Sequence, residues 1–75
     1  MFRVGAFRFF FFSREEPRMH VHVAHPDGEA KFWIKPVVAL ADHTGLNAKT
    51  LREVQEIVEE RNSEITQAWK KHFGK

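Results

Sequence analysis

Two histidines two residues apart are the strongest chemical signal in this sequence, because histidine titrates near neutral pH and also binds metals. His20 and His22 lie in MHVHVA, residues 19–24, where apolar and polar side chains alternate. This alternation predicts a strand with both imidazoles side by side on one face. Such a pair could act as general acid and base in metal-free RNA cleavage, or it could supply two nitrogen ligands to zinc.

Both chemistries need further residues, which the sequence supplies only in part. Zinc would take its remaining ligands from Asp42, His43 or a second chain. RNA cleavage would need a cation for the phosphate, such as Arg8, Arg18 or Lys31, but no Gly-rich phosphate loop or carboxylate cluster accompanies the histidines. The simplest interpretation of the pair is therefore a polar patch or a protein interface without a cofactor. A zinc site and a catalytic pair are the alternatives.

A run of phenylalanines precedes the histidines and must be positioned with them. The stretch FRFFFF, residues 7–12, has five phenylalanines in six positions. Aromatic residues favour strands, so we predict a first strand over residues 4–12. A strand with one solvent-facing side should alternate apolar and polar residues, and this one hardly does. Both of its faces are apolar, which raises the question of what covers the second one.

The middle of the chain predicts a hairpin. HPDGE, residues 25–29, combines proline and glycine in the manner of a tight turn, and a strand is expected after it over residues 30–35. Residues 37–42 fit either a short fourth strand or one turn of helix, and we favour the strand. A loop is expected over residues 42–45.

The C-terminal third predicts a long amphipathic helix. Asn47 is a candidate N-cap, and apolar residues recur at spacings of three and four over residues 48–73. Asn62-Ser63 could loosen the helix or restart it. We therefore predict a single α+β domain over residues 1–75, in which a small antiparallel sheet of three or four strands is covered on one face by the long C-terminal helix.

The uncovered sheet face is the predicted interaction surface. Strand alternation assigns Val21, Val23, Ala30, Phe32 and Ile34 to the helix side. It leaves the opposite face with Arg8, Phe10, Phe12, His20, His22, Lys31 and Trp33. Exposing two phenylalanines and a tryptophan forgoes about 1.5 to 3 kcal/mol of burial for each side chain, so we expect a partner to cover this face. The same aromatic residues could instead stack on single-stranded nucleic acid.

Composition limits the classes of protein to consider. The net charge is +2 with a sequence pI near 9.3, a smaller excess than dedicated nucleic-acid binders carry. There is no cysteine and no apolar run of membrane-spanning length, so we expect a soluble cytoplasmic protein without a membrane partner. A chain of 75 residues without disulfides usually needs support from oligomerisation.

Several of these segments together resemble a bacterial family catalogued as domain of unknown function 4160. The resemblance rests on the aromatic strand at 7–12, on PRMHVHV at 17–23, which is similar to the family's PPHxHV stretch, on DGEAKFWI at 27–34, and on a final helix closing with Ala68-Trp69 and Phe73. It covers nearly the whole chain. This sequence departs from the pattern where Arg18-Met19 replaces a second proline and its neighbour.

The resemblance implies a partner and supplies no reaction. Many members of that family are encoded beside another small domain, of unknown function 2442, in an arrangement similar to a toxin–antitoxin pair. We therefore expect an interaction module whose partner is a second copy or the small protein of the adjacent gene. A metal-independent ribonuclease toxin using His20 and His22 is the alternative, and a nucleic-acid-binding, transcription-associated protein is the third hypothesis.

Overall fold

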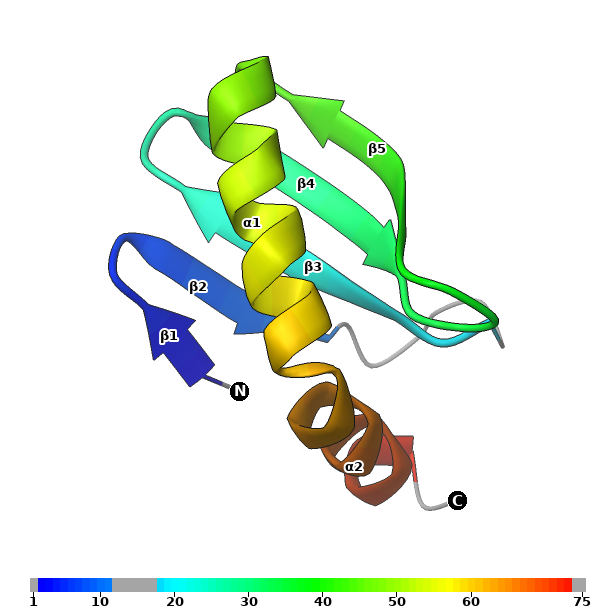
Figure 1. Ribbon diagram of the computed structural model, residues 1–75. Helices are drawn as coiled ribbons and strands as arrows, with labels where there is room; N and C mark the ends of the chain where they lie inside the picture. Colours follow the sequence, from blue (N-terminus) through cyan, green and yellow to red (C-terminus); the bar gives the residue numbers. More distant parts are fainter. Residues whose placement is uncertain (1, 12–17, 74–75) are drawn as a thin grey trace.

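The fold is a five-stranded antiparallel sheet packed against two C-terminal helices (Figure 1). A computed structural model describes residues 2–11 and 18–73. The strands are β1 (Phe2–Val4), β2 (Phe7–Phe10), β3 (His20–His25), β4 (Gly28–Trp33) and β5 (Ala39–Thr44). They lie side by side in the order in which they occur in the sequence, and each neighbouring pair is antiparallel. The predicted α+β class is confirmed, with five strands in place of three or four.

The predicted first strand consists of two strands joined by a tight turn. Val4 pairs with Phe7, and the two residues between them, Gly5 and Ala6, form the turn. Gly5 has a φ of 57°, which is the left-handed region that glycine enters without steric cost. The expectation of one strand from residue 4 was therefore wrong, because the run of aromatic residues hid the turn. Part of that predicted strand, including Phe12, lies outside the described residues.

The second hairpin agrees with the sequence. His25 pairs with Gly28 across the turn residues Pro26 and Asp27, so β3 and β4 form the predicted hairpin with boundaries shifted by one or two residues. The last strand, β5, extends to Thr44 and includes the segment 42–44 that was expected to be a loop. Its register with β4 shifts between Lys31 and Phe32, and this irregularity interrupts the alternation that would have revealed the strand.

The apolar core lies between α1 and the sheet face assigned to it. Cross-strand neighbours Phe9, Val23 and Ala30 form one buried row, and Val21 and Phe32 form the next. Val54 and Val58 of α1 cover them, and neither has any exposed surface. The five residues predicted to face the helix, which are Val21, Val23, Ala30, Phe32 and Ile34, are all at least 95% buried. That part of the prediction is confirmed.

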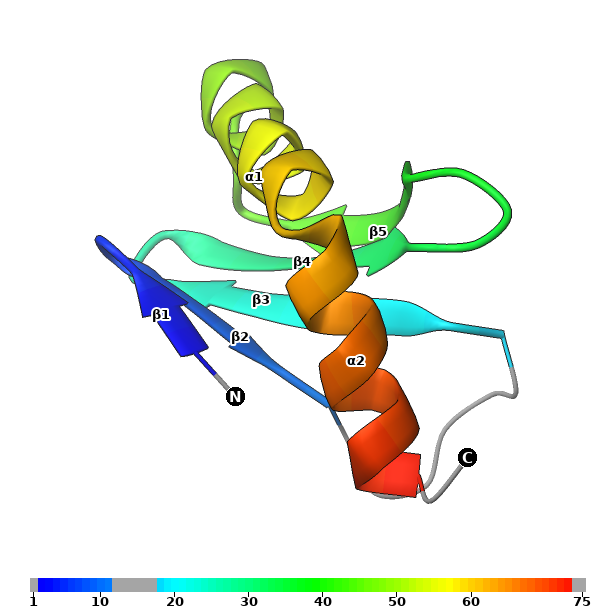
Figure 2. The ribbon, with the colours of Figure 1, turned by 60° about the horizontal axis from the view of Figure 1, so that its bottom comes forward.

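The C-terminal helix is bent into two. The first helix, α1 (Ala48–Glu60), is capped by Asn47, whose side chain accepts a 2.8 Å hydrogen bond from the Thr50 N–H, as predicted. Arg61 interrupts the helix with φ −104° and ψ 21°, and α2 (Asn62–Phe73) begins directly after it. In Figure 2, α1 lies over the sheet while α2 turns away and runs past the end of the sheet.

The helix restarts at Asn62, as Asn62-Ser63 indicated, although the apolar stripe continues through the bend. Ile65 and Trp69 of α2 are still buried, at 0% and 8% exposure. The structure contains no helix, within residues 2–11 and 18–73, that is long and apolar enough to cross a membrane.

Candidate interaction surface on the second sheet face

The sheet face opposite α1, here called the second face, carries Arg8, Phe10, His20, His22, Lys31 and Trp33, which are the residues predicted for the interaction surface that the structure describes. Strand register arranges its side chains in rows across the sheet. The charged row consists of Arg3, Arg8, Ala24, Glu29 and Thr44. The middle row consists of Phe10, His22, Lys31 and Asp42. His20 and Trp33 pair at the end of the face nearest α2.

His20 is enclosed by the protein. It has no exposed surface, and its Nδ1 lies 2.8 Å from the Arg18 carbonyl oxygen. A carbonyl oxygen only accepts, so Nδ1 carries the hydrogen and donates it. The rings of Trp69 and Trp33 meet the imidazole edge-on, at centroid distances of 5.1 and 5.8 Å. These contacts make His20 a packing residue that links the sheet to α2, and they leave no path for a solvent-borne substrate to its ring.

His22 is half-buried and lies next to His20, as predicted. The two ring centroids are 5.1 Å apart, and Phe10 stacks on His22 at 5.6 Å. The structure does not bring the candidate zinc ligands together around them. Lys31 separates Asp42 from His22 in the middle row, and His43 pairs with Ala30 on the opposite face. The described residues contain no group of three or more side chains that could hold a metal ion.

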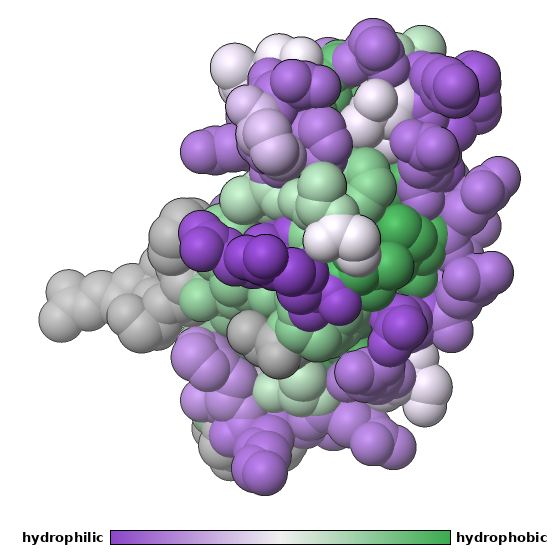
Figure 3. All heavy atoms as spheres, turned by 90° about the vertical axis from the view of Figure 1, so that its left-hand side faces the viewer, coloured by the Kyte–Doolittle hydropathy of each residue, from purple (hydrophilic) through white to green (hydrophobic). Residues whose placement is uncertain are grey.

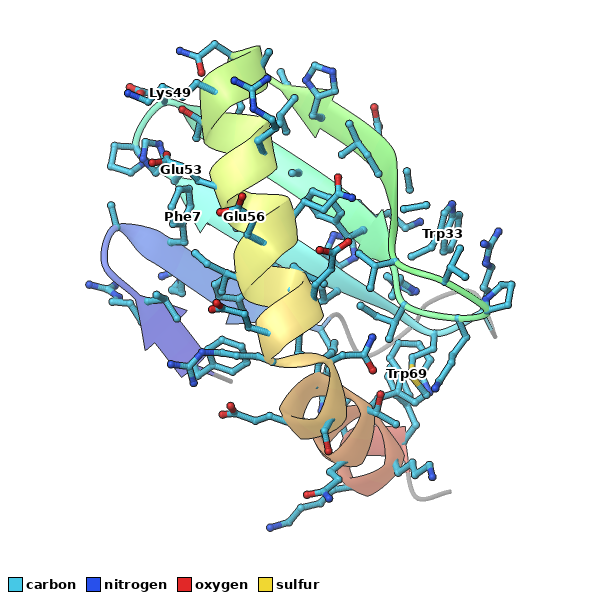
Figure 4. All side chains as sticks on the ribbon, viewed as in Figure 1. Phe7, Trp33, Lys49, Glu53, Glu56 and Trp69 are labelled. Carbon is cyan, nitrogen blue, oxygen red and sulfur yellow. The ribbon has the colours of Figure 1, made fainter. Side chains whose placement is uncertain are left out.

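Trp33 is held between two cations. The Arg18 guanidinium carbon lies 4.3 Å from the ring centroid and the Lys31 ammonium lies 4.6 Å from it, both within cation–π range. Arg18 is fixed in place by a 2.9 Å hydrogen bond from its Nε to the Lys35 carbonyl. Figure 4 shows Trp33 at the end of β4 and Trp69 on α2. Trp33 was expected to contact a partner, but side chains of the same chain already contact its ring.

The aromatic residues of the second face are less exposed than the sequence indicated. Phe10 and Trp33 are both half-buried, and Arg8 lies 5.8 Å above the Phe10 ring. Of the large hydrophobic residues that the structure describes, only Val37 and Leu40 are exposed, at 65% and 39%. Side chains of the same chain supply part of the cover that we assigned to a partner. Sequence periodicity could not show this, because the bend at Arg61 is what brings α2 to this end of the sheet.

The exposed part of the second face is its charged end. Arg3, Arg8, Glu29 and Asp42 are all exposed, and none of them forms an ion pair with another described residue. Two shallow hollows flank the centre of this end. One of about 350 Å³ is lined by Arg3, Arg8 and Ala24 among others. The other, of about 190 Å³, is lined by His22, Glu29, Lys31 and Asp42 among others.

This grouping was not predicted from the sequence, because it depends on the first hairpin. Gly5 was the available signal: a turn at Gly5-Ala6 places Arg3 directly opposite Arg8. Glu29 and Asp42 were assigned to a turn and a loop, and the structure places both in strands, where alternation directs them to the second face.

The β1 side of the molecule has a different character. Figure 3 looks onto this side and shows apolar surface in the middle with hydrophilic residues around it. Phe2, Val4 and Ile57 are partly buried there against the core, and the Arg61 guanidinium carbon lies 5.3 Å from the Phe2 ring centroid. This surface continues the core.

The chain is similar to a known protein family. Residues 6–70 match the family model described as "Domain of unknown function (DUF4160)". No curated protein and no solved structure matches the chain.

Proposed function

The chain belongs to the family of domain of unknown function 4160, and on that premise we propose that it is a protein-interaction module, one component of a toxin–antitoxin-like pair in a bacterial cytoplasm. Its partner is a second copy or the small protein of the adjacent gene, and the working surface is the second face. The proposal concerns binding alone and includes no reaction.

The observation that supports the proposal is the pair of exposed arginines at the charged end. Arg3 and Arg8 lie directly opposite one another on β1 and β2, and both are exposed. Like charges at directly opposed positions of an antiparallel pair destabilise the sheet. No described carboxylate is paired with either of them to offset this cost. The fold alone does not explain why two arginines lie opposite each other. A partner that supplies negative charges would explain it.

The ribonuclease alternative has less support. General acid–base catalysis needs both groups within hydrogen-bonding reach of the substrate, and His20 has no exposed surface. His22 would have to act alone, because no substrate can reach the enclosed ring of His20. The same enclosure weighs against His20 as a zinc ligand.

The nucleic-acid alternative also has less support. Stacking of bases needs an open aromatic face, and Trp33 already lies between Arg18 and Lys31. The exposed charges of the second face also include Glu29 and Asp42, which would repel a phosphate backbone laid across the strands.

Co-purification with the product of the adjacent gene tests the proposal. The tagged chain and that product are expressed together, and the amount retained on the tag is measured for the wild type and for Arg3→Glu. We expect Arg3→Glu to reduce the retained partner by about tenfold, because a like charge replaces an attractive one at the interface. Cell growth is followed in parallel with either protein expressed alone.

Lys49→Glu is the matched control. Lys49 lies on α1, on the side of the molecule away from the second face (Figure 4), and it is exposed. This charge reversal should leave partner retention unchanged. Equal retention with Arg3→Glu and the wild type would contradict the use of the second face. Failure of the two proteins to bind at all would remove the adjacent gene product as the partner.

A further inference from the structure

We propose that two copies of this chain associate face to face through the charged end of the second face, with the two-fold axis running along β3. This inference rests on the proposed function, because it takes the second face as an interaction surface and names its occupant. In the resulting dimer, Arg8 of each copy lies opposite Glu29 of the other copy.

The order of charges across the sheet carries the inference. Reading along the charged row, the strands present Arg3 on β1, Arg8 on β2, Ala24 on β3 and Glu29 on β4, and Asp42 follows on β5 in the next row. The exposed ionic residues are therefore cationic in one half of this end and anionic in the other, where the half-buried Lys31 lies beside Asp42. A surface with this order is complementary to itself once one copy is reversed.

Two sheets can stack face to face about a two-fold axis that runs either along the strands or across them. Only the axis along the strands makes use of this complementarity. An axis along β3 lays β1 and β2 of one copy over β5 and β4 of the other, and it keeps each residue at the same height along the strands. Arg8 of each copy then lies opposite Glu29 of the other copy. Arg3 of each copy lies opposite the end of the other copy's β5 that carries Asp42. The rotation about an axis across the strands would lay β1 over β1 and place arginine on arginine.

The centre of the charged row permits close approach. Ala24 lies on β3, at the position of the axis, and its short side chain leaves room between the stacked sheets. Stacked sheets lie about 10 Å apart, a gap that an arginine and a glutamate can span together. The long charged side chains of Arg8 and Glu29 then lie on either side of the axis, and Ala24 leaves space between them.

The balance of charge favours a second copy over a polyanion. The exposed ionic residues of this end are two cations, Arg3 and Arg8, and two anions, Glu29 and Asp42. A nucleic acid would pair with the first two and be repelled by the last two. A second copy offers a counter-charge for all four.

The expected dimer is weak and sensitive to salt. A stable interface usually buries at least about 600 Å² on each partner, which is about an eighth of this chain's surface of 4889 Å². The charged end is only one part of the second face, so we expect a small interface. Since the charge pairs lie near solvent, added salt should screen them.

Sedimentation velocity measures the association. The wild-type chain is examined at concentrations up to about 100 μM, a range suited to weak interfaces, in roughly 50 mM and roughly 500 mM NaCl. We expect a reversible dimer at low salt and a weaker one at high salt. Arg8→Glu and Glu29→Arg should each raise the dissociation constant by at least about tenfold.

Mixing the two variants provides the specific test. The Arg8→Glu variant carries an anion at both paired positions and the Glu29→Arg variant carries a cation at both, so a two-fold arrangement pairs opposite charges at each contact. The mixture should dimerise although each variant alone is monomeric. An interface that does not bring Arg8 of one copy near Glu29 of the other would not show this rescue. Lys49→Glu and Glu53→Arg, two exposed positions on α1 in Figure 4, are controls that should leave the wild-type association unchanged.

The outcomes separate this inference from the proposed function. A wild-type chain that stays monomeric at low salt, or a mixture that stays monomeric, overturns the inference. If such a monomer still binds the adjacent gene product and loses it in Arg3→Glu, the proposed function stands without self-association. If the wild type dimerises, the mixed variants dimerise and the chain does not bind the adjacent gene product, the inference is supported. The partner is then a second copy and not the protein of the adjacent gene.

Discussion

At the scale of single residues, His20 and His22 show how similar side chains acquire different roles from their surroundings. Both leave β3 on the second face, two residues apart, as alternation predicts. His20 is enclosed under Trp69 and bonded to the Arg18 carbonyl, whereas His22 is half-buried beside Phe10. The pair that suggested shared chemistry in the sequence therefore has two unequal members.

Replacing each histidine by alanine should reveal the difference in stability. His20→Ala removes a filled core volume and leaves the Arg18 carbonyl without that donor, so we expect a loss of about 2–4 kcal/mol in the free energy of unfolding. His20→Asn should lose less, because the asparagine amide can donate from near the Nδ1 position. Urea denaturation measures both. His22→Ala is the control, with an expected loss of about 1 kcal/mol or less. Equal losses at the two positions would contradict the packing role of His20.

The isolated wild-type chain should cleave no RNA above background. Acid–base cleavage by two histidines gives a bell-shaped rate maximum between about pH 5 and 8, and loss of either ring costs ~10²-fold or more. The measurement is the rate of cleavage of a fluorescent RNA across that pH range. Clear cleavage that either His22→Asn or His20→Asn abolishes, in variants shown to be folded by circular dichroism, would restore the ribonuclease hypothesis.

At the scale of elements, local sequence signals located the features that depend on neighbours in the chain. The His25–Glu29 turn, the Asn47 cap and the alternation in β3 were all predictable, because each depends on a few adjacent residues. Asn62-Ser63 indicated where the helix could restart, but the direction of the bend at Arg61 was not predictable, because the apolar periodicity is unbroken on either side of it. The enclosure of His20 depends on that bend and on Trp69, 49 positions further along the chain. Contacts of that kind leave no local pattern.

Two turn glycines allow an element-scale prediction. Gly5 and Gly45 have φ angles of 57° and 81°, where alanine is strained. An added Cβ at Gly5 meets nothing within 4 Å, but at Gly45 it would lie 2.3 Å from the Asp27 carbonyl oxygen. We expect Gly5→Ala to cost about 1–2 kcal/mol from backbone strain alone. Gly45→Ala should cost at least about 1 kcal/mol more, since backbone must also shift.

Thermal unfolding followed by circular dichroism compares these two variants. Both substitutions add the same methyl group, so each serves as the other's control for the change in unfolded-state entropy. Equal unfolding temperatures would mean that Gly45 does not lie close to Asp27 of the β3–β4 turn in solution.

At the scale of the whole molecule, α2 completes the structure at two places. Ile65 extends the core under α1, and Trp69 closes the end of the sheet over His20 and against Phe11, at a ring-centroid distance of 5.4 Å. A chain of this length has a total stability of about 4–11 kcal/mol. Burying one isoleucine and one tryptophan contributes a large share of that total.

A chain ending at Arg61 should therefore fail to fold cooperatively. Loss of a buried isoleucine costs about 2–5 kcal/mol and loss of a buried tryptophan about 3–5 kcal/mol, which together approach the whole stability. The measurement is the near-ultraviolet circular dichroism and thermal transition of residues 1–61. The point variant Trp69→Phe keeps an aromatic ring in place and should retain a cooperative but lower transition. A sharp transition in the shortened chain would show that the sheet and α1 are sufficient.

The strand order also determines the sequence of events during synthesis on the ribosome. Each strand pairs with the strand made just before it, so every hairpin can close as soon as its second arm has emerged. The helices that cover the apolar face are made last, and residues 48–73 take about 1–5 s to synthesise at roughly 5–20 residues per second. During that interval Phe9, Val21 and Phe32 have no cover. The nascent sheet is then open to chaperones and to aggregation, for a time determined by the rate of translation.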